Sequence, residues 1–253
     1  MSGRVILVTG VSRGIGRAIV DVLMKDSDAV VYGISQSEGA LVKMKSQFGS
    51  RFDYVVGDVS KEENIKQLVD RAIGKHGRLD SVIANAGVLA PVQDVNHIAV
   101  DEWKRLFDVN FFSIVSLVKL TIDYISKTNG NYIFVSSGAS VKSYYAWGAY
   151  GASKAALNHF TMTIASEEEK VKAIAVAPGV VDTQMQVDIR EKFGPESMTP
   201  EALKRFTDLK ENDQLVPSIV PATIYANLAL KGIPQELNGQ YLRYNDEKLK
   251  EFL

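Results

Sequence analysis

The chain has 253 residues, 46% of them hydrophobic, with a formal net charge of -1 and no cysteine. The balanced charge gives no electrostatic reason to expect nucleic acid or an anionic membrane, and the lack of cysteine excludes disulfides and thiolate metal sites. Because His76, His97 and His159 lack ligand spacing and no apolar run approaches the roughly 20 residues of a membrane helix, we expect no metal, no membrane span and a cytoplasmic protein.

Apolar, strand-like segments alternate with amphipathic helices along the whole chain. We expect strands near residues 4–9, 29–34, 52–57, 80–84, 131–136, 172–177 and 239–242. Helices are expected near residues 15–26, 38–48, 61–75, 101–127, 149–170 and 216–230. No linker or low-complexity tract divides the chain, so residues 1–253 are interpreted as one α/β domain. The alternation predicts a doubly wound, seven-stranded, mostly parallel sheet with helices on both faces.

The first strand leads directly into a glycine-rich turn and then into a helix. Glycines let the backbone turn tightly and approach a ligand, and the free N–H groups of a helix N-terminus attract phosphate. The spacing differs from the usual G-x-G-x-x-G pattern, so an ordinary strand-to-helix connection is the alternative. The position after the first strand favours a dinucleotide site, whose residues would be Gly10, Ser12, Arg13, Gly14, Ile15 and Gly16.

Small and polar residues also follow four later strands, in the segments Gly57-Asp58, Asn85-Ala86-Gly87, Ser136-Ser137-Gly138 and Pro178-Gly179-Val-Val-Asp-Thr183. Each alone is ordinary turn chemistry. Because the carboxyl ends of parallel strands share one edge of the sheet, all of them together predict a ligand site there.

Tyr150 and Lys154 lie four residues apart on an expected helix and so share a face. A phenol has a pKa of about 10, and a neighbouring cation can lower it enough for acid–base work on a carbonyl oxygen. The alternative is that the tyrosine packs and the lysine reaches solvent.

Together these residues resemble the classical short-chain dehydrogenase/reductase family. The resemblance rests on Thr9-Gly10-x-x-x-Gly14-x-Gly16, Asn85-Ala86-Gly87, Asn110, Ser137, Tyr150-x-x-x-Lys154 and Pro178-Gly179. It implies a Rossmann fold with Tyr150 as general acid and Ser137 holding the substrate oxygen. It also implies that Lys154 binds the nicotinamide ribose and lowers the pKa of the phenol, while Asn110 orders a proton-relay water.

The same resemblance implies that the cofactor contacts extend beyond the glycine turn. Asp58 would meet the adenine, Asn85 the adenosine ribose region, and Thr183, close to Val181, the nicotinamide carboxamide. A carboxylate that would repel a 2′-phosphate is missing from the end of the second strand, and Arg13 could pair with that phosphate. We therefore expect NADPH, although Arg13 could instead be a solvated turn residue.

Within the family the chain looks most like the sepiapterin reductase and fungal benzil reductase branch. We expect reduction of an aromatic or apolar α-diketone such as benzil to an (S)-hydroxyketone. The cavity walls would come from Tyr144, Tyr145, Trp147, Met185, Val187 and Phe193, although these could equally be core or interface residues. A sepiapterin reductase would need a carboxylate, for which Asp246 or Glu247 is available. The sequence is also compatible with a 3-oxoacyl reductase and with a non-enzymatic NADP-binding regulator.

Two further segments contain apolar residues that are expected to be buried against another part of the chain, a substrate or a second subunit. Residues 184–213 interrupt the alternation of strands and helices and are expected to form a substrate-binding loop or lid, or a pair of surface helices packed on the body. The expected helix 101–127 is more apolar than one buried stripe requires, which favours a homodimer, although packing against its own sheet and neighbouring helix would also account for it. Its apolar residues are Trp103, Leu106, Phe107, Phe111, Phe112, Val115 and Leu117.

Overall fold

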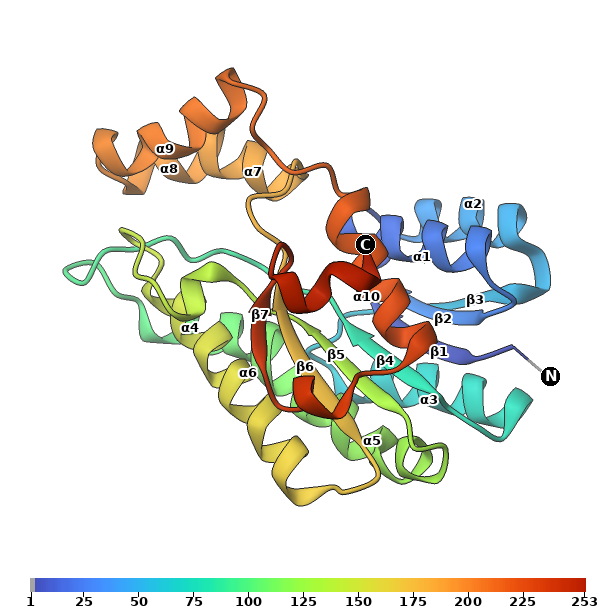
Figure 1. The fold of residues 1–253 in the computed structure, drawn as a ribbon. Coiled ribbons are helices and arrows are strands. Elements are labelled where there is room, and N and C mark those ends of the chain that lie inside the picture. The colour runs from blue at the N-terminus through green and yellow to red at the C-terminus, as the bar shows by residue number, and fades with distance from the viewer. Residues whose placement is uncertain (1–2) are drawn as a thin grey trace.

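A seven-stranded sheet in which every strand pairs in parallel forms the centre of the computed structural model, which describes residues 3–253 (Figure 1). The strands lie in the order β3-β2-β1-β4-β5-β6-β7, which confirms the doubly wound Rossmann-type fold. Their bounds are β1 Val5–Thr9, β2 Val30–Ser35, β3 Phe52–Val56, β4 Ser81–Ala84, β5 Asn131–Val135, β6 Lys172–Ala177 and β7 Tyr241–Arg243. The sheet is wholly parallel, where the sequence predicted a mostly parallel one; residues 1 and 2 of the expected domain lie outside the described range.

Alternate residues of a strand point to opposite faces, so this sheet has an apolar core on each side. In β1, Ile6 and Val8 belong to one core, and Val5 and Leu7 to the other. Helices α1 (Gly14–Asp26), α2 (Glu38–Phe48) and α10 (Ile219–Lys231) cover the first core (Figure 1). The second core is covered by α3 (Glu62–His76), α5 (Ser113–Lys127) and α6 (Gly148–Glu167). Short 3-10 helices occupy Gly49–Arg51, Gly138–Ser140, Gln235–Leu237 and Glu247–Phe252.

The expected single helix over residues 101–127 is interrupted, which corrects that prediction. It consists of α4 (Val100–Phe107), a π-helical turn (Asp108–Phe112) and α5. Within the π turn, Asn110 is fully buried and holds the backbone of Val88 through both of its amide atoms. A π turn inserts an extra residue into a helix and is frequent at functional sites. The interruption therefore lets one helix residue reach the loop that follows β4.

Residues 184–213 form helices that stand apart from the sheet (Figure 1). They are α7 (Gln184–Asp188), a π-helical turn (Ile189–Phe193), α8 (Gly194–Ser197) and α9 (Pro200–Glu211). Phe206 of α9 is buried and stacks on Trp147, with ring centroids 5.2 Å apart. The segment is thus a helical one that packs an apolar stripe on the body, and it also overhangs the carboxyl edge of the sheet.

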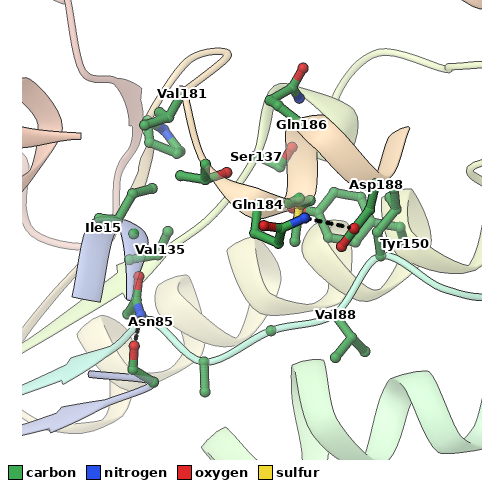
Figure 2. A pocket seen from close by; sticks show the side chains of 18 of the residues that line it. Ile15, Asn85, Val88, Val135, Ser137, Tyr150, Val181, Gln184, Gln186 and Asp188 are labelled. Atoms are coloured by element: carbon green, nitrogen blue, oxygen red, sulfur yellow. Dashed lines mark hydrogen bonds between the residues drawn. The ribbon is translucent and has the colours of Figure 1, made fainter. Parts of the chain in front are cut away.

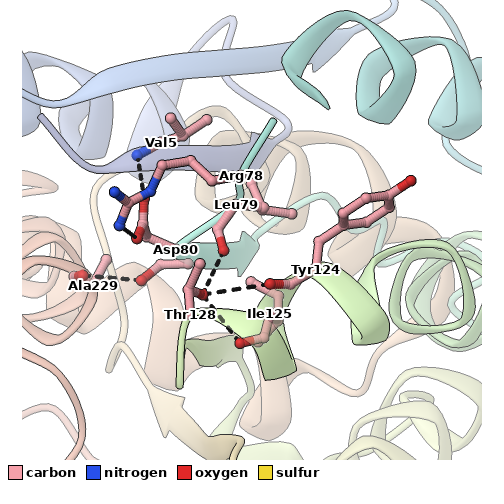
Figure 3. Close-up of polar contacts among 9 residues, drawn as sticks. Val5, Arg78, Leu79, Asp80, Tyr124, Ile125, Thr128 and Ala229 are labelled. Carbon is pink, nitrogen blue, oxygen red and sulfur yellow. Dashed lines mark hydrogen bonds and ion pairs between the residues drawn. The ribbon is translucent and has the colours of Figure 1, made fainter. Parts of the chain in front are cut away.

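Buried and partly buried polar contacts stabilise the amino edge of the sheet, opposite the carboxyl ends of the strands (Figure 3). Asp80 accepts a hydrogen bond of 2.8 Å from the Val5 backbone and is paired with Arg78. Thr128 donates to the Leu79 carbonyl at 2.7 Å, and Ser81 donates to the Ala229 carbonyl at 2.9 Å. These contacts join β1, β4, α10 and the end of α5. They stabilise the fold at this edge, whereas the carboxyl edge of the sheet is available to bind a ligand. None of the helices described in residues 3–253 is long and apolar enough to cross a bilayer.

Candidate active site

The carboxyl ends of the strands border a cavity of about 550 Å³, at the edge the sequence predicted (Figure 2). Its wall contains twelve of the fourteen predicted site residues: Gly10, Ser12, Arg13, Gly14, Ile15, Asp58, Asn85, Ser137, Tyr150, Lys154, Val181 and Thr183. Gly16 and Asn110 lie behind the wall. Figure 2 shows Ile15, Asn85 and Val181 toward one end of the cavity, and Ser137 and Tyr150 toward the other.

The glycine turn is held closely against the loop after β4. Gly10 has a φ of +74°, and a Cβ there would lie 2.9 Å from the Ala86 backbone. At Gly16 a Cβ would lie 2.1 Å from the Gly10 carbonyl, so no side chain fits. Asn85 donates from its amide nitrogen to the Thr9 and Gly10 carbonyls at 3.0 and 3.1 Å. The Asn85 amide therefore fixes the turn, and its predicted contact with the adenosine ribose region stays a prediction.

The end of the cavity next to β2 carries hydroxyls and a cation. Ser35 and Ser12 share a hydrogen bond of 3.0 Å, and the Ser12 backbone donates to the Ser35 oxygen. Gln36 and Ser37 complete this part of the wall, which contains no carboxylate before Asp58. Arg13 is exposed at the mouth, and within residues 3–253 no hydrogen bond or ion pair engages its guanidinium. These residues fit a dinucleotide that carries an additional phosphate, because a guanidinium binds phosphate well and no acid opposes it.

At the other end, α6 brings two buried ionisable groups together. Lys154 is 3% exposed and donates to the Val135 carbonyl at 2.8 Å, and its Nζ lies 5.9 Å from the centroid of the Tyr150 ring. Burial lowers the pKa of Lys154 to about 8. Burial also raises the pKa of Tyr150, and the Ser137 hydroxyl opposes that rise. In the protein without cofactor, burial thus has the larger effect on the phenol pKa, and a net lowering would need further positive charge in the cavity besides Lys154.

Asn158, a residue not among the predicted site residues, holds the Ser137 loop. Asn158 accepts from the Ser136 hydroxyl at 2.6 Å and donates to Ser140 at 2.8 Å. Ser140 in turn donates to the Ser137 carbonyl at 2.6 Å. Asn158 lies one helical turn beyond Lys154, so the i, i+4, i+8 spacing from Tyr150 was the available signal. The helix that carries the tyrosine therefore also positions the serine.

The Asn110 side-chain amide forms hydrogen bonds with neighbouring protein atoms through both its oxygen and its nitrogen. Its oxygen accepts from the Val88 backbone N–H at 2.8 Å, and its nitrogen donates to the Val88 carbonyl at 2.8 Å and to Ser153 at 3.3 Å. The side chain thus ties the loop after β4 to α6, immediately behind Lys154. Its predicted part in ordering a relay water stays a prediction.

An aromatic stack closes the Tyr150 end of the cavity. Tyr144 and Phe206 lie on Trp147, with ring centroids 5.1 and 5.2 Å away, and Trp147 meets Tyr150 edge-on at 5.8 Å. Met185 and Phe193 also line the cavity, as expected. Two expected wall residues do not: Tyr145 is exposed with its hydroxyl on Asp94, and Val187 lies outside the wall. Neighbouring residues of a loop or helix point in different directions, which explains both corrections.

Charged and polar residues of the helical segment 184–213 also line the cavity, and none of them was among the residues predicted from the sequence. They are Gln184, Gln186, Asp188 and Arg205. The two candidate pterin-binding carboxylates lie elsewhere: Asp246 caps the Lys248 backbone, and Glu247 pairs with Lys250. Asp188 supplies the carboxylate of this part of the cavity instead. In the described part of the chain, no group of three or more His, Cys, Asp and Glu side chains is arranged to hold a metal.

Comparisons with known proteins agree with this geometry. A family model described as short chain dehydrogenase matches residues 4–194. The oxidoreductase YIR035C of Saccharomyces cerevisiae is 62% identical over 252 residues, 99% of each chain, and its crystal structure has a TM-score of 0.98 to this chain. The benzil reductase ((S)-benzoin forming) IRC24 of the same yeast is 52% identical over 257 residues, 98% of each chain. The crystal structure of a cytoplasmic protein with unknown function from this yeast is 60% identical, has a TM-score of 0.86 and covers 99% of this chain and 100% of its own.

Proposed function

The chain belongs to the short chain dehydrogenase family of oxidoreductases, and from this premise we propose that it is an NADPH-dependent carbonyl reductase. Its substrates would be aromatic or apolar ketones and α-diketones such as benzil, reduced to an (S)-hydroxyketone. The observation that carries the proposal is the position of Tyr150 and Ser137 together at one end of a cavity whose other end is a glycine turn (Figure 2).

In this mechanism Tyr150 gives its phenolic proton to the substrate oxygen. Burial raises the pKa of Tyr150, so the phenol keeps its proton at neutral pH until the substrate oxygen gains negative charge. Ser137 donates a second hydrogen bond to the same oxygen, and both donors stabilise that charge more than they stabilise the neutral carbonyl. Bound NADPH would supply the hydride to the carbonyl carbon.

Lys154 would act from the helical turn behind the tyrosine. A pKa of about 8 leaves its ammonium mostly protonated at neutral pH. With Nζ 5.9 Å from the phenol ring, this charge stabilises the phenolate that remains after proton transfer. Its hydrogen bond to the Val135 carbonyl keeps the ammonium at the cavity wall, within reach of a cofactor hydroxyl.

The preference for NADPH is supported by charge at the β2 end of the cavity. Arg13 is free to pair with a 2′-phosphate, and the hydroxyls of Ser12 and Ser37 lie in the same wall. A carboxylate that would bind the 2′-hydroxyl of NADH is missing from residues 35–37. The glycine turn and the N-terminus of α1 would hold the pyrophosphate.

The choice of an aromatic diketone is supported by the wall and by a relative. The stack of Tyr144, Trp147 and Phe206 offers flat apolar surface beside Tyr150, which suits a phenyl ring. The benzil reductase of yeast is 52% identical to this chain along nearly its whole length. Residues 184–213 would cover the bound substrate as a lid, since their helices line the cavity at this end.

A second candidate is sepiapterin-type reduction, which one observation favours. Asp188 places a carboxylate in the cavity wall, where it could accept hydrogen bonds from the amino groups of a pterin. Its Oδ1 accepts at 3.1 Å from Gln184, which leaves the other oxygen for a ligand. For this candidate, Asp188→Asn would lower turnover of sepiapterin and leave turnover of benzil nearly unaffected.

We also propose that the protein is a cytoplasmic homodimer. The 60% identical yeast structure is that of a cytoplasmic protein. Phe112, the last residue of the π turn that leads into α5, is 53% exposed, and Met162 of α6 is 50% exposed, so apolar side chains reach the surface at both helices. Light scattering at micromolar concentration tests the dimer, which a monomer mass would contradict.

The proposed function is tested by following NADPH oxidation with benzil, sepiapterin and an acetoacetyl thioester, each repeated with NADH. We expect turnover of benzil with NADPH and little with NADH. Faster turnover of sepiapterin would select the second candidate, and faster turnover of the thioester would indicate a 3-oxoacyl reductase. Tight NADPH binding without turnover of any carbonyl would contradict the enzymatic proposal.

A further inference from the structure

Six charged residues line the cavity, and four of them are cations. The cations are Arg13, Lys154, Arg205 and Arg243, and the anions are Asp58 and Asp188. The whole chain has a net charge of -1, so positive charge is concentrated at this wall. The proposed cofactor contacts use Arg13 and Lys154, and they leave two guanidinium groups of the wall without an assigned ligand.

Of these two cations, Arg205 is the one whose guanidinium lies on the aromatic stack. It belongs to α9 of the overhanging segment, and its guanidinium carbon is 5.3 Å from the centroid of the Tyr144 ring. Tyr144 stacks on Trp147, which meets Tyr150 edge-on. Because cation–π attraction holds a guanidinium over a ring, the position of this exposed side chain is restricted. Arg205 thus places a positive charge beside the aromatic wall that would contact the substrate.

The Arg205 guanidinium has its donors available. In the described part of the chain no hydrogen bond or ion pair engages it, whereas its neighbour Lys204 is paired with Asp208 at 2.6 Å. Asp188, the carboxylate of this part of the wall, accepts from Gln184 at 3.1 Å and does not pair with Arg205. A guanidinium has N–H donors and no acceptor, and its planar fork matches two oxygens of a carboxylate or a phosphate.

We propose that Arg205 binds an anionic oxygen group of the substrate, at the end remote from the reacting carbonyl. The inference rests on the proposed carbonyl reduction and narrows its substrates to ketones that carry an acidic group beyond an aromatic or apolar spacer. A spacer is needed because Arg205 is linked to Tyr150 only through the rings of Tyr144 and Trp147. The group could come from a carboxylate of the substrate or from the phosphates of a coenzyme A thioester.

The first arm of the test compares para-carboxybenzil with para-carbamoylbenzil, which has nearly the same shape and no charge. We measure kcat/KM for both compounds in the wild type, Arg205→Met, Arg205→Lys and Lys204→Met. The wild type should prefer the acid at least about fivefold, and Arg205→Met should lose that preference. Methionine is unbranched and can still pack on the Tyr144 ring. Arg205→Lys should keep part of the preference, because lysine keeps the charge without the planar fork.

Lys204→Met is the matched control, since it removes one positive charge from the same helix but none from the cavity wall. Its preference for the acid should stay within about twofold of the wild type. Added salt should weaken the preference of the wild type, because salt screens the attraction between exposed charges. An equal loss in both methionine variants would assign the preference to the overall charge of α9 and overturn the subsite.

The second arm compares acetoacetyl-coenzyme A with acetoacetyl-N-acetylcysteamine, which lacks the phosphates. A preference for the coenzyme A thioester that Arg205→Met removes would identify a phosphate as the anionic group. A preference for para-carboxybenzil that the same variant removes would identify a carboxylate. If Arg205→Met alters neither preference, or if it weakens NADPH binding instead, the subsite is refuted.

Calorimetric binding of the two benzil derivatives in the presence of NADP⁺ separates this inference from the proposed function. If the wild type binds the acid preferentially, Arg205→Met loses that preference and neither compound is reduced, the subsite stands and the reductase proposal fails. If the wild type reduces the compounds of both pairs without preferring the anionic member of either, the subsite is refuted while carbonyl reduction stands. Absence of binding to any of these compounds refutes both. The wild-type preferences and their salt dependence can be measured even if a variant does not fold.

Discussion

Lys154→Met should stabilise the cofactor-free protein at neutral pH while it abolishes turnover. Methionine has a similar length and no charge, so it fills the same buried space beside Tyr150. Burial lowers the pKa of Lys154 from 10.5 to about 8, and at about 1.4 kcal/mol per pH unit the buried ammonium costs the folded state about 3 kcal/mol. The variant also loses the hydrogen bond to the Val135 carbonyl, worth about 1–2 kcal/mol. The net expectation is a gain of about 1–2 kcal/mol at pH 7.

The sign of the pH dependence follows from the lowered pKa. Between pH 8 and pH 10.5 the unfolded chain binds a proton at Lys154 that the folded protein has released, so the stability of the wild type rises through this interval. Lys154→Met has no such proton. The advantage of the variant is therefore complete below pH 8 and shrinks by about 3 kcal/mol by pH 10.5, where the wild type becomes the more stable protein.

Urea unfolding of both proteins without cofactor, at pH 7 and pH 10, measures this difference, because all other titrating groups are common to the pair. Lys142→Met is the control: Lys142 is exposed, and its replacement should change stability by less than about 0.5 kcal/mol at either pH. A variant less stable than the wild type by more than about 1 kcal/mol at pH 7, or a difference that does not change with pH, would refute the assignment of a destabilising buried ammonium.

Three further predictions address the cofactor, the Ser137 loop and the opposite edge of the sheet. Arg13→Ala should weaken NADPH binding about 10- to 100-fold and leave NADH binding unchanged, as titration of protein fluorescence would reveal; unchanged NADPH affinity would count against the pairing with the 2′-phosphate. Asn158→Leu should lower kcat at least about tenfold, because the Ser137 loop loses its tie to α6, with cofactor affinity retained; equal loss of both would indicate a general folding defect. Asp80→Ala should lower the free energy of unfolding by about 2–4 kcal/mol without changing kcat, since it leaves the Val5 N–H unpaired far from the cavity; a loss under 1 kcal/mol would contradict this.

The periodicity of the sequence predicted the elements well because the five central strands, β1, β2, β4, β5 and β6, are buried on both faces. The five residues of β1, for example, are apolar or small and all buried, and the glycines after it mark its end. Apart from the interrupted helix, the expected elements end within three residues of the observed ones. The interruption at Asn110 was invisible because it depends on Val88, which lies 22 residues away in the chain.

Residue type and strand order indicate which residues lie at the carboxyl edge of the sheet, but they do not indicate side-chain direction, as the exposed Tyr145 shows. Tyr150, Lys154 and Ser137 meet because parallel strands end at one edge. The direction of the Asn85 amide depends on how closely the glycine turn approaches it, which a sequence does not state. Likewise, the burial of Gln186 becomes apparent only once α7 is packed over the cavity.

The most direct test of the central proposal is the turnover of benzil by Tyr150→Phe, together with its affinity for NADPH. Phenylalanine keeps the ring beside Trp147 and removes only the hydroxyl that would donate the proton. We predict a fall in kcat of at least about a thousandfold, with an NADPH dissociation constant within about threefold of the wild type. A variant that retains a tenth of the wild-type rate would contradict the assignment of Tyr150 as proton donor.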